Sequence, residues 1–170
     1  NYGSILFLPT IGDFSSDNLF TSNNQDYIPS FSVGRIAAIK PSEIRAYFEK
    51  LKEYEAVKSQ AQSFENKLWT KRILHLVGGE GENEENTIFN YLQSAGNALE
   101  NNSFGAKQKT FRKFYDETII TESFGLIQNQ VNAGLAIINV FGHSNSNFTQ
   151  YGIDDVSIYS NKGKYPLFIS

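Results

Sequence analysis

The stretch from Ala136 to Ser144, AIINVFGHS, decides the fold prediction. Residues 137–141 form a short apolar run broken only by Asn139, and such a run is typical of a buried strand. The run ends in Gly142 and His143. Open α/β sheets collect their chemistry at the carboxyl ends of strands, and a histidine there can act as an acid, a base or a ligand near neutral pH. The alternative is a histidine that only caps the strand and bonds a backbone carbonyl.

Strand and helix patterns alternate along the rest of the chain. Apolar runs predict strands over residues 5–8, 31–37, 73–77, 110–115, 137–141 and 167–169. Apolar residues at helical spacing predict helices over residues 41–60, 86–100 and 122–132. This alternation predicts an α/β fold with a mainly parallel sheet and helices on both faces. The length of 170 residues fits one domain spanning 1–170.

Composition limits the classes of partner. The formal net charge of −3 gives no electrostatic basis for binding nucleic acid or an anionic membrane. No apolar run is long enough to span a bilayer, so membrane insertion is not expected. The chain has no cysteine, which excludes disulfides and thiolate metal sites within these residues.

The second histidine and the glycine-rich loop after it receive structural interpretations. His75 lies inside the apolar run 73–77, which favours a core or cross-strand hydrogen-bonded histidine. The loop 78–81, GGEG, lacks the Lys-Ser/Thr of a phosphate-binding loop, and its acidic neighbours would repel phosphate. A flavodoxin-like ligand domain would need a phosphate-binding loop, and none is found in this sequence. Several carboxylates near one loop could hold structural calcium, but their spacing matches no calcium loop, so no metal site is assigned.

The segment from Phe141-Gly142-His143-Ser144 to the stretch 159–169, YSNKGKYPLFI, resembles the gingipain-like cysteine peptidases of family C25. It is most similar to the branch associated with type IX secretion, including the PorU-type sortases. The segments 9–10, 16–18 and 33–36 share the resemblance, which therefore covers nearly the whole chain. It implies a caspase-like fold. In this family a strand ends in a Gly-His pair and the next core strand ends in the nucleophilic cysteine, so the resemblance implies a catalytic domain cut just before its nucleophile.

The resemblance implies roles for individual residues. His143 would take the thiol proton and later protonate the leaving amine. Glu80 would orient the imidazole, as the third member of a serine triad does, with Glu84 or Glu85 as competing matches if the alignment slips. The solvated acidic loop is the alternative for all three carboxylates.

Two main-chain roles follow at the strand end. Gly142 leaves room for the substrate backbone, and the N–H of Ser144 is a candidate oxyanion donor. The commoner form in the family is Gly-His-Gly, and Ser144 departs from it.

The expected function is a cysteine endopeptidase domain that acts on protein or peptide substrates without a cofactor. It would belong to a secreted or outer-surface bacterial protein and would be inactive as these residues alone. The alternative is a non-catalytic caspase-like scaffold or binding module in a type IX secretion protein. The residue that ends the strand starting at Leu167 separates the two, because only a cysteine supports the enzyme.

Overall fold

The computed structural model describes residues 30–32, 34, 36, 38–60, 63–101, 103–113, 121–143, 151 and 153–170. The chain divides into two compact units, residues 1–46 and 47–170, and each is described by itself. In the first unit, the described residues contribute the start of helix α1 (Pro41–Ser59). The sheet and the candidate site belong to the second unit.

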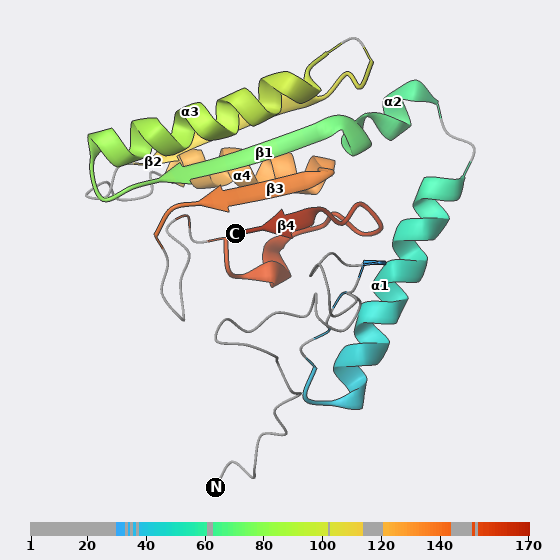
Figure 1. Ribbon diagram of the computed structural model, residues 1–170. Coiled ribbons are helices and arrows are strands. Elements are labelled where there is room, and N and C mark those ends of the chain that lie inside the picture. Colours follow the sequence, from blue (N-terminus) through green and yellow to red (C-terminus); the bar gives the residue numbers. More distant parts are fainter. Residues whose placement is uncertain are drawn as a thin grey trace, which may run out of the picture. The chain divides into compact units, whose positions relative to one another are not determined.

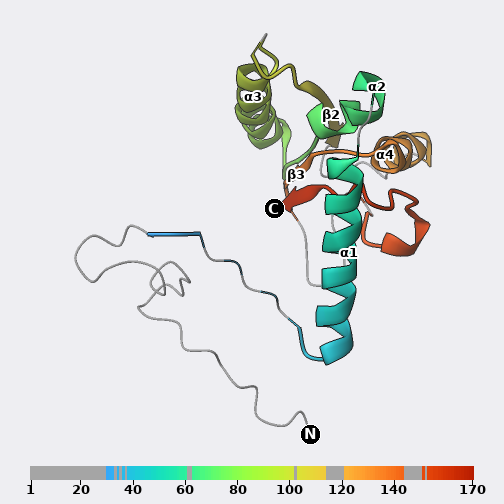
Figure 2. The ribbon, with the colours of Figure 1, turned by 90° about the vertical axis from the view of Figure 1, so that its right-hand side faces the viewer.

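A four-stranded, all-parallel sheet forms the centre of the second unit, in the order β2-β1-β3-β4 (Figure 1). The strand bounds are β1 Arg72–Gly78, β2 Lys107–Lys113, β3 Ile137–Phe141 and β4 Leu167–Ile169. Helix α3 (Glu82–Leu99) lies on one face and helix α4 (Thr121–Ala133) on the other (Figure 2). The predicted α/β fold with a parallel sheet is confirmed, and it is consistent with a caspase-like fold.

Most predicted elements are present with shifted ends. Helix α3 begins four residues before the predicted 86, because the acidic first turn of Glu82, Glu84 and Glu85 suits the positive end of a helix dipole. Helix α4 ends before Gly134, whose φ of 90° favours glycine. Strand β2 begins three residues before the predicted 110–115 run, whose last residues lie outside the described part.

Two predicted strands have a different outcome. The 5–8 run lies outside the described residues. Within the 31–37 run the described residues 31, 32, 34 and 36 are not in a strand. The short elements α2 (Phe64–Lys67), η2 (Leu68–Lys71) and η3 (Val156–Ile158) were not predicted, since a single turn contains too few residues to show a period.

A cluster of buried apolar side chains lies between the sheet and α4. Leu74 and Leu76 of β1 pack there with Ile127, Val131 and Ile138, and all of them are buried. Alternate residues of a strand face opposite sides, so the intervening His75 faces α3 instead. Both faces of β1 are therefore covered by helices, as expected for a parallel strand with a continuous apolar run.

His75 is a buried core histidine, as predicted. Only 1% of its surface is exposed, and the side-chain amide of Asn139, its register partner on β3, lies 3.0 Å from its Nδ1. Since the amide nitrogen donates, Nδ1 accepts and the ring proton belongs on Nε2. Burial disfavours the imidazolium and lowers the pKa of His75, an effect partly opposed by the side chain of Gln108.

The lowered pKa of His75 predicts a loss of stability in mild acid. The unfolded chain binds a proton near its ordinary value of 6.5 while the folded chain does not, so stability is complete above that pH and falls as the pH drops below it. Urea unfolding at pH 7.5 and about pH 5.5 should show a decrease of up to about 1.4 kcal/mol per pH unit in this window. The variant His75→Gln should be less stable at pH 7.5 and should show a flatter pH profile. An equally steep profile in that variant would assign the effect to another group.

Candidate active site at the carboxyl edge of the sheet

Parallel pairing brings three strand ends to one edge of the sheet. In the register of β1 with β3, Val77 lies opposite Phe141, and in that of β3 with β4, Asn139 lies opposite Ile169. His143, the loop after Gly78 and Ser170 therefore follow strands that point in the same direction (Figure 1). An all-parallel sheet requires this common edge, because all of its strands end on the same side.

Two carboxylates approach the imidazole of His143. Its Nε2 lies 3.1 Å from Oε2 of Glu84, and its Nδ1 lies 3.7 Å from Oε1 of Glu80. The His143 side chain is 44% exposed, so it is neither enclosed in the core nor remote from solvent. A half-exposed imidazole with a carboxylate at hydrogen-bonding distance is suited to proton transfer.

Glu84 binds the loop as well as the histidine. Its Oε2 accepts a hydrogen bond of 2.7 Å from the backbone N–H of Glu80, and Nε2 of His143 approaches the same oxygen. The Glu80 N–H, and after it His143, lower the pKa of the Glu84 carboxyl below its ordinary value of 4.5. Glu84 is therefore a carboxylate at neutral pH and an acceptor for an imidazole N–H.

The structure distinguishes the three competing glutamates. Glu80, the favoured match, lies near His143 but beyond direct hydrogen-bonding distance, whereas Glu84 lies within it. Glu85 points elsewhere, because its carboxylate is buried and paired with Arg112 of β2. Of the main-chain candidates, Gly142 follows β3 directly, and Ser144 lies outside the described residues.

Two contacts at this edge were not predicted. Arg112 contacts the first turns of α3, which only the register of β2 with β1 reveals. The buried hydroxyl of Tyr151 donates to the carbonyl of Val77 and lies 2.9 Å from that of Phe111. Tyr151 therefore ties the chain eight residues after His143 to the carboxyl ends of β1 and β2.

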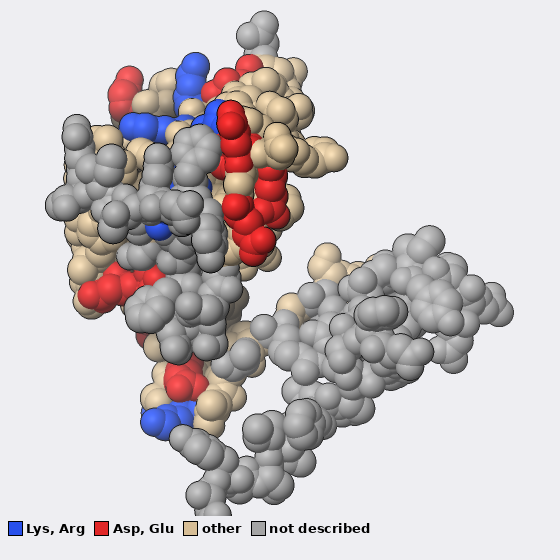
Figure 3. Space-filling model, turned by 90° about the vertical axis from the view of Figure 1, so that its left-hand side faces the viewer, with Lys and Arg blue, Asp and Glu red and all other residues tan. Residues whose placement is uncertain are grey.

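The edge carries a concentrated negative charge. Figure 3 shows acidic side chains gathered over the start of α3, where Glu82 and Glu84 of the first turn are exposed and Glu85 is buried. These carboxylates repel one another, and the positive end of the helix dipole, with the N–H groups of the first turn, offsets part of that repulsion. Among the described residues, no group of three or more His, Cys, Asp or Glu side chains is arranged to hold a metal ion.

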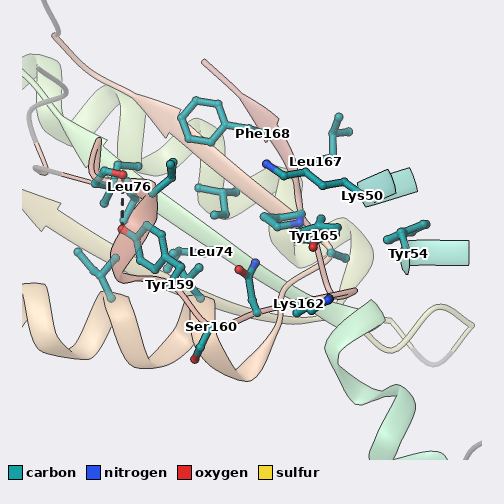
Figure 4. A pocket seen from close by; sticks show the side chains of 18 of the residues that line it. Lys50, Tyr54, Leu74, Leu76, Tyr159, Ser160, Lys162, Tyr165, Leu167 and Phe168 are labelled. Atoms are coloured by element: carbon teal, nitrogen blue, oxygen red, sulfur yellow. Dashed lines mark hydrogen bonds between the residues drawn. The ribbon is translucent and has the colours of Figure 1, made fainter. Parts of the chain in front are cut away.

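The described cavity of about 850 Å³ lies elsewhere in the second unit (Figure 4). Its walls come from α1, α4, the strands β1, β3 and β4 and the segment before β4, and they include Lys50, Tyr54, Tyr159, Tyr165 and Phe168. Neither His143 nor the two glutamates beside it line this cavity. The candidate chemistry is therefore at the open edge of the sheet rather than in the cavity.

The fold and the edge define an α/β domain with a histidine–carboxylate pair where parallel strands end. The family model described as peptidase family C25 matches residues 2–170, and the chain belongs to that family. This supports a cysteine peptidase-type domain whose substrates are proteins or peptides. No curated protein and no solved structure matches the chain significantly. No helix in the described part of the chain is long and apolar enough to cross a membrane.

Gly79 should tolerate no side chain, because the start of α3 lies directly against it. A Cβ at this position would lie 2.7 Å from the backbone nitrogen of Glu85. Gly79→Ala should therefore push the loop and helix apart and lower the free energy of unfolding by about 1–3 kcal/mol, measured in urea.

The matched control is Gly125→Ala in α4, where a Cβ meets nothing within 4 Å. That change should be neutral or stabilise the chain by up to about 1 kcal/mol, since alanine is the better helix former. Equal effects of the two changes would contradict the close packing at Gly79.

Proposed function

We propose that this chain supplies the histidine side of a cysteine peptidase active site. The observation that supports it best is the placement of His143 beside Glu84 at the carboxyl end of β3, next to the end of β4. Membership of peptidase family C25 supplies the reaction class. The reaction is acyl transfer to a thiol, followed by transfer of the acyl group to water or to an amine.

In the proposed mechanism His143 moves the protons. The imidazole takes the thiol proton, the thiolate attacks the scissile carbonyl, and the imidazolium protonates the leaving amine to give a thioester. Water or an incoming amine then attacks the thioester, returns a proton through His143 and releases the thiol. Glu84 accepts from Nε2–H and so holds the ring and its tautomer, with Glu80 as a second carboxylate near Nδ1. Backbone N–H groups after Gly142, that of Ser144 included, stabilise the oxyanion.

The thiol itself must come from outside these residues, because the chain contains no cysteine. We assign it to a residue that follows β4 beyond Ser170, since β4 is the neighbour of β3 and ends at the same edge. The 170-residue chain alone should then lack peptidase activity. The proposed reaction needs no cofactor, because the thiol and the imidazole supply both the nucleophile and the proton transfer.

The proposed setting is a secreted or outer-surface bacterial protein of the type IX secretion branch, acting as an endopeptidase or as a PorU-type sortase. Its resemblance to that branch motivates this assignment. The second candidate is a caspase-like scaffold without catalysis, which the absence of a thiol in these residues keeps open. The absence of a cysteine shortly beyond Ser170 in the natural protein would favour the scaffold.

The direct test uses the natural protein extended past Ser170 and a peptide substrate with a fluorogenic amine. His143→Ala should lower kcat/KM by at least about 100-fold, since general acid–base catalysis contributes that much or more. Glu84→Gln should cost about 10-fold through the lost charged hydrogen bond. The matched control is Asn161→Ala, a change at the cavity away from this edge, which should leave kcat/KM unchanged. Thiol-dependent cleavage that continues unchanged with alanine at position 143 would overturn the role of His143 in proton transfer, and an extended protein that cleaves no peptide would overturn the peptidase assignment.

A further inference from the structure

A buried ion pair joins the start of α3 to the carboxyl end of β2. The Glu85 side chain is completely buried, and both of its oxygens accept hydrogen bonds from Arg112, one from Nε and one from Nη2. Such a two-pronged contact fixes the relative orientation of the two groups as well as their distance. Arg112 lies opposite Val77 in the sheet, so the pair is anchored one residue before the end of β1.

Arg112 has further contacts with the same helix. Its Nη2 donates to Oδ1 of Asn86 at 2.6 Å, and its guanidinium lies 4.3 Å from the centre of the Phe89 ring. The Arg112 side chain is 35% exposed, so the pair is closed on the helix side and open on the other. The first two turns of α3 therefore share one guanidinium as their common point of attachment.

The backbone of Glu85 also sets the loop that carries Glu80. Its N–H donates to the carbonyl of Gly81 at 3.0 Å, and the Cα of Gly79 packs so closely that a methyl group would not fit between them. Successive helix residues are about 100° apart around the axis. When Glu85 points at Arg112, Glu84 is thereby turned toward His143 and the Glu80 N–H.

We propose that the Glu85–Arg112 pair positions Glu84 against His143, which makes both members positioning residues for the active site. The inference rests on the proposed function for its consequence in catalysis, but its geometric claim concerns this chain alone. A buried ion pair is a poor source of stability, because the loss of hydration offsets the attraction between the charges. The presence of the pair is better explained by its orientation-specific geometry, because the neighbouring His143–Glu84 contact is exposed and weak by itself.

The test measures the pKa of the Glu84 carboxyl by carbon-13 NMR in the chain as it stands. That pKa is low because the Glu80 N–H and His143 contact the carboxylate, so it reports on the position of Glu84. Glu85→Gln places an amide N–H₂ against the guanidinium and breaks the two-pronged pair. If the pair positions Glu84, its pKa should rise toward the ordinary 4.5.

Charge alone predicts the opposite sign, which makes this variant decisive. Removing the negative charge of Glu85 without moving Glu84 should lower the pKa of Glu84 further. The double variant Glu85→Gln/Arg112→Gln leaves the net charge unchanged and should still raise it. Arg112→Lys keeps the charge but loses the fork, and should raise it by a smaller amount.

Val131→Ala in the core on the α4 face is the control for general destabilisation. It should lower the unfolding midpoint and leave the pKa of Glu84 where it is. A pKa of Glu84 that falls or stays unchanged in Glu85→Gln overturns the positioning role. If that variant is too unstable to study, an unchanged pKa of Glu84 in Arg112→Lys overturns it instead.

The catalytic consequence is measured separately in the extended protein. In that protein, Glu85→Gln should lower kcat by about 10-fold or more and should change KM less. The reason is that a small misplacement of a catalytic group strongly slows the reaction. The two claims can fail separately. If Glu85→Gln raises the pKa of Glu84 but substitutions of Glu84 and His143 leave the cleavage rate unchanged, the positioning claim stands and the proposed function is refuted.

Discussion

The parallel pairing of β1 with β3, which sets Val77 opposite Phe141, is the constraint on which the candidate site depends. It brings His143 level with the loop after β1, and that loop leads directly into α3. A slip of one residue would exchange the faces of β3 and move Asn139 away from His75 as well as His143 away from Glu84. The burial of Leu74 and Leu76 on one face and of His75 on the other therefore fixes the register of the strands, and with it the position of His143 at the edge.

The contacts at His143 differ sharply in how they are held. The His143–Glu84 contact is about half exposed on both sides, and exposed ion pairs of this kind contribute little to stability. Around it, the Glu85 carboxylate and the Tyr151 hydroxyl are buried, and together with the partly exposed Arg112 they tie β1, β2 and α3 together. In the proposed mechanism the proton-transferring imidazole thus stays accessible to solvent and substrate, while the groups proposed to set its geometry are largely buried. The cavity on the α4 face has no part in this arrangement.

The parallel sheet could be predicted from the sequence because it depends on local pattern and direction. The apolar runs of β1 and β3 read clearly as strands, and strands that run parallel must end at the same edge, so His143 and Glu80 could be placed together. The choice between Glu80 and Glu84 depended on where α3 begins. The helix was predicted to start at 86, and only its true start at Glu82 turns Glu84 toward the histidine. The partner of Glu85 depended on the register of β2, a non-local property that no spacing in the chain reveals.

The central claim is that His143 serves a thiol carried by a residue beyond Ser170, close to the end of β4. The most direct measurement is labelling of the extended natural protein with a peptide that carries a thiol-alkylating group, followed by digestion and mass spectrometry. The account predicts that the label lies on a cysteine within a few residues of Ser170, and that His143→Ala slows its attachment strongly. A label on a distant cysteine, or equally fast labelling with alanine at position 143, would contradict it.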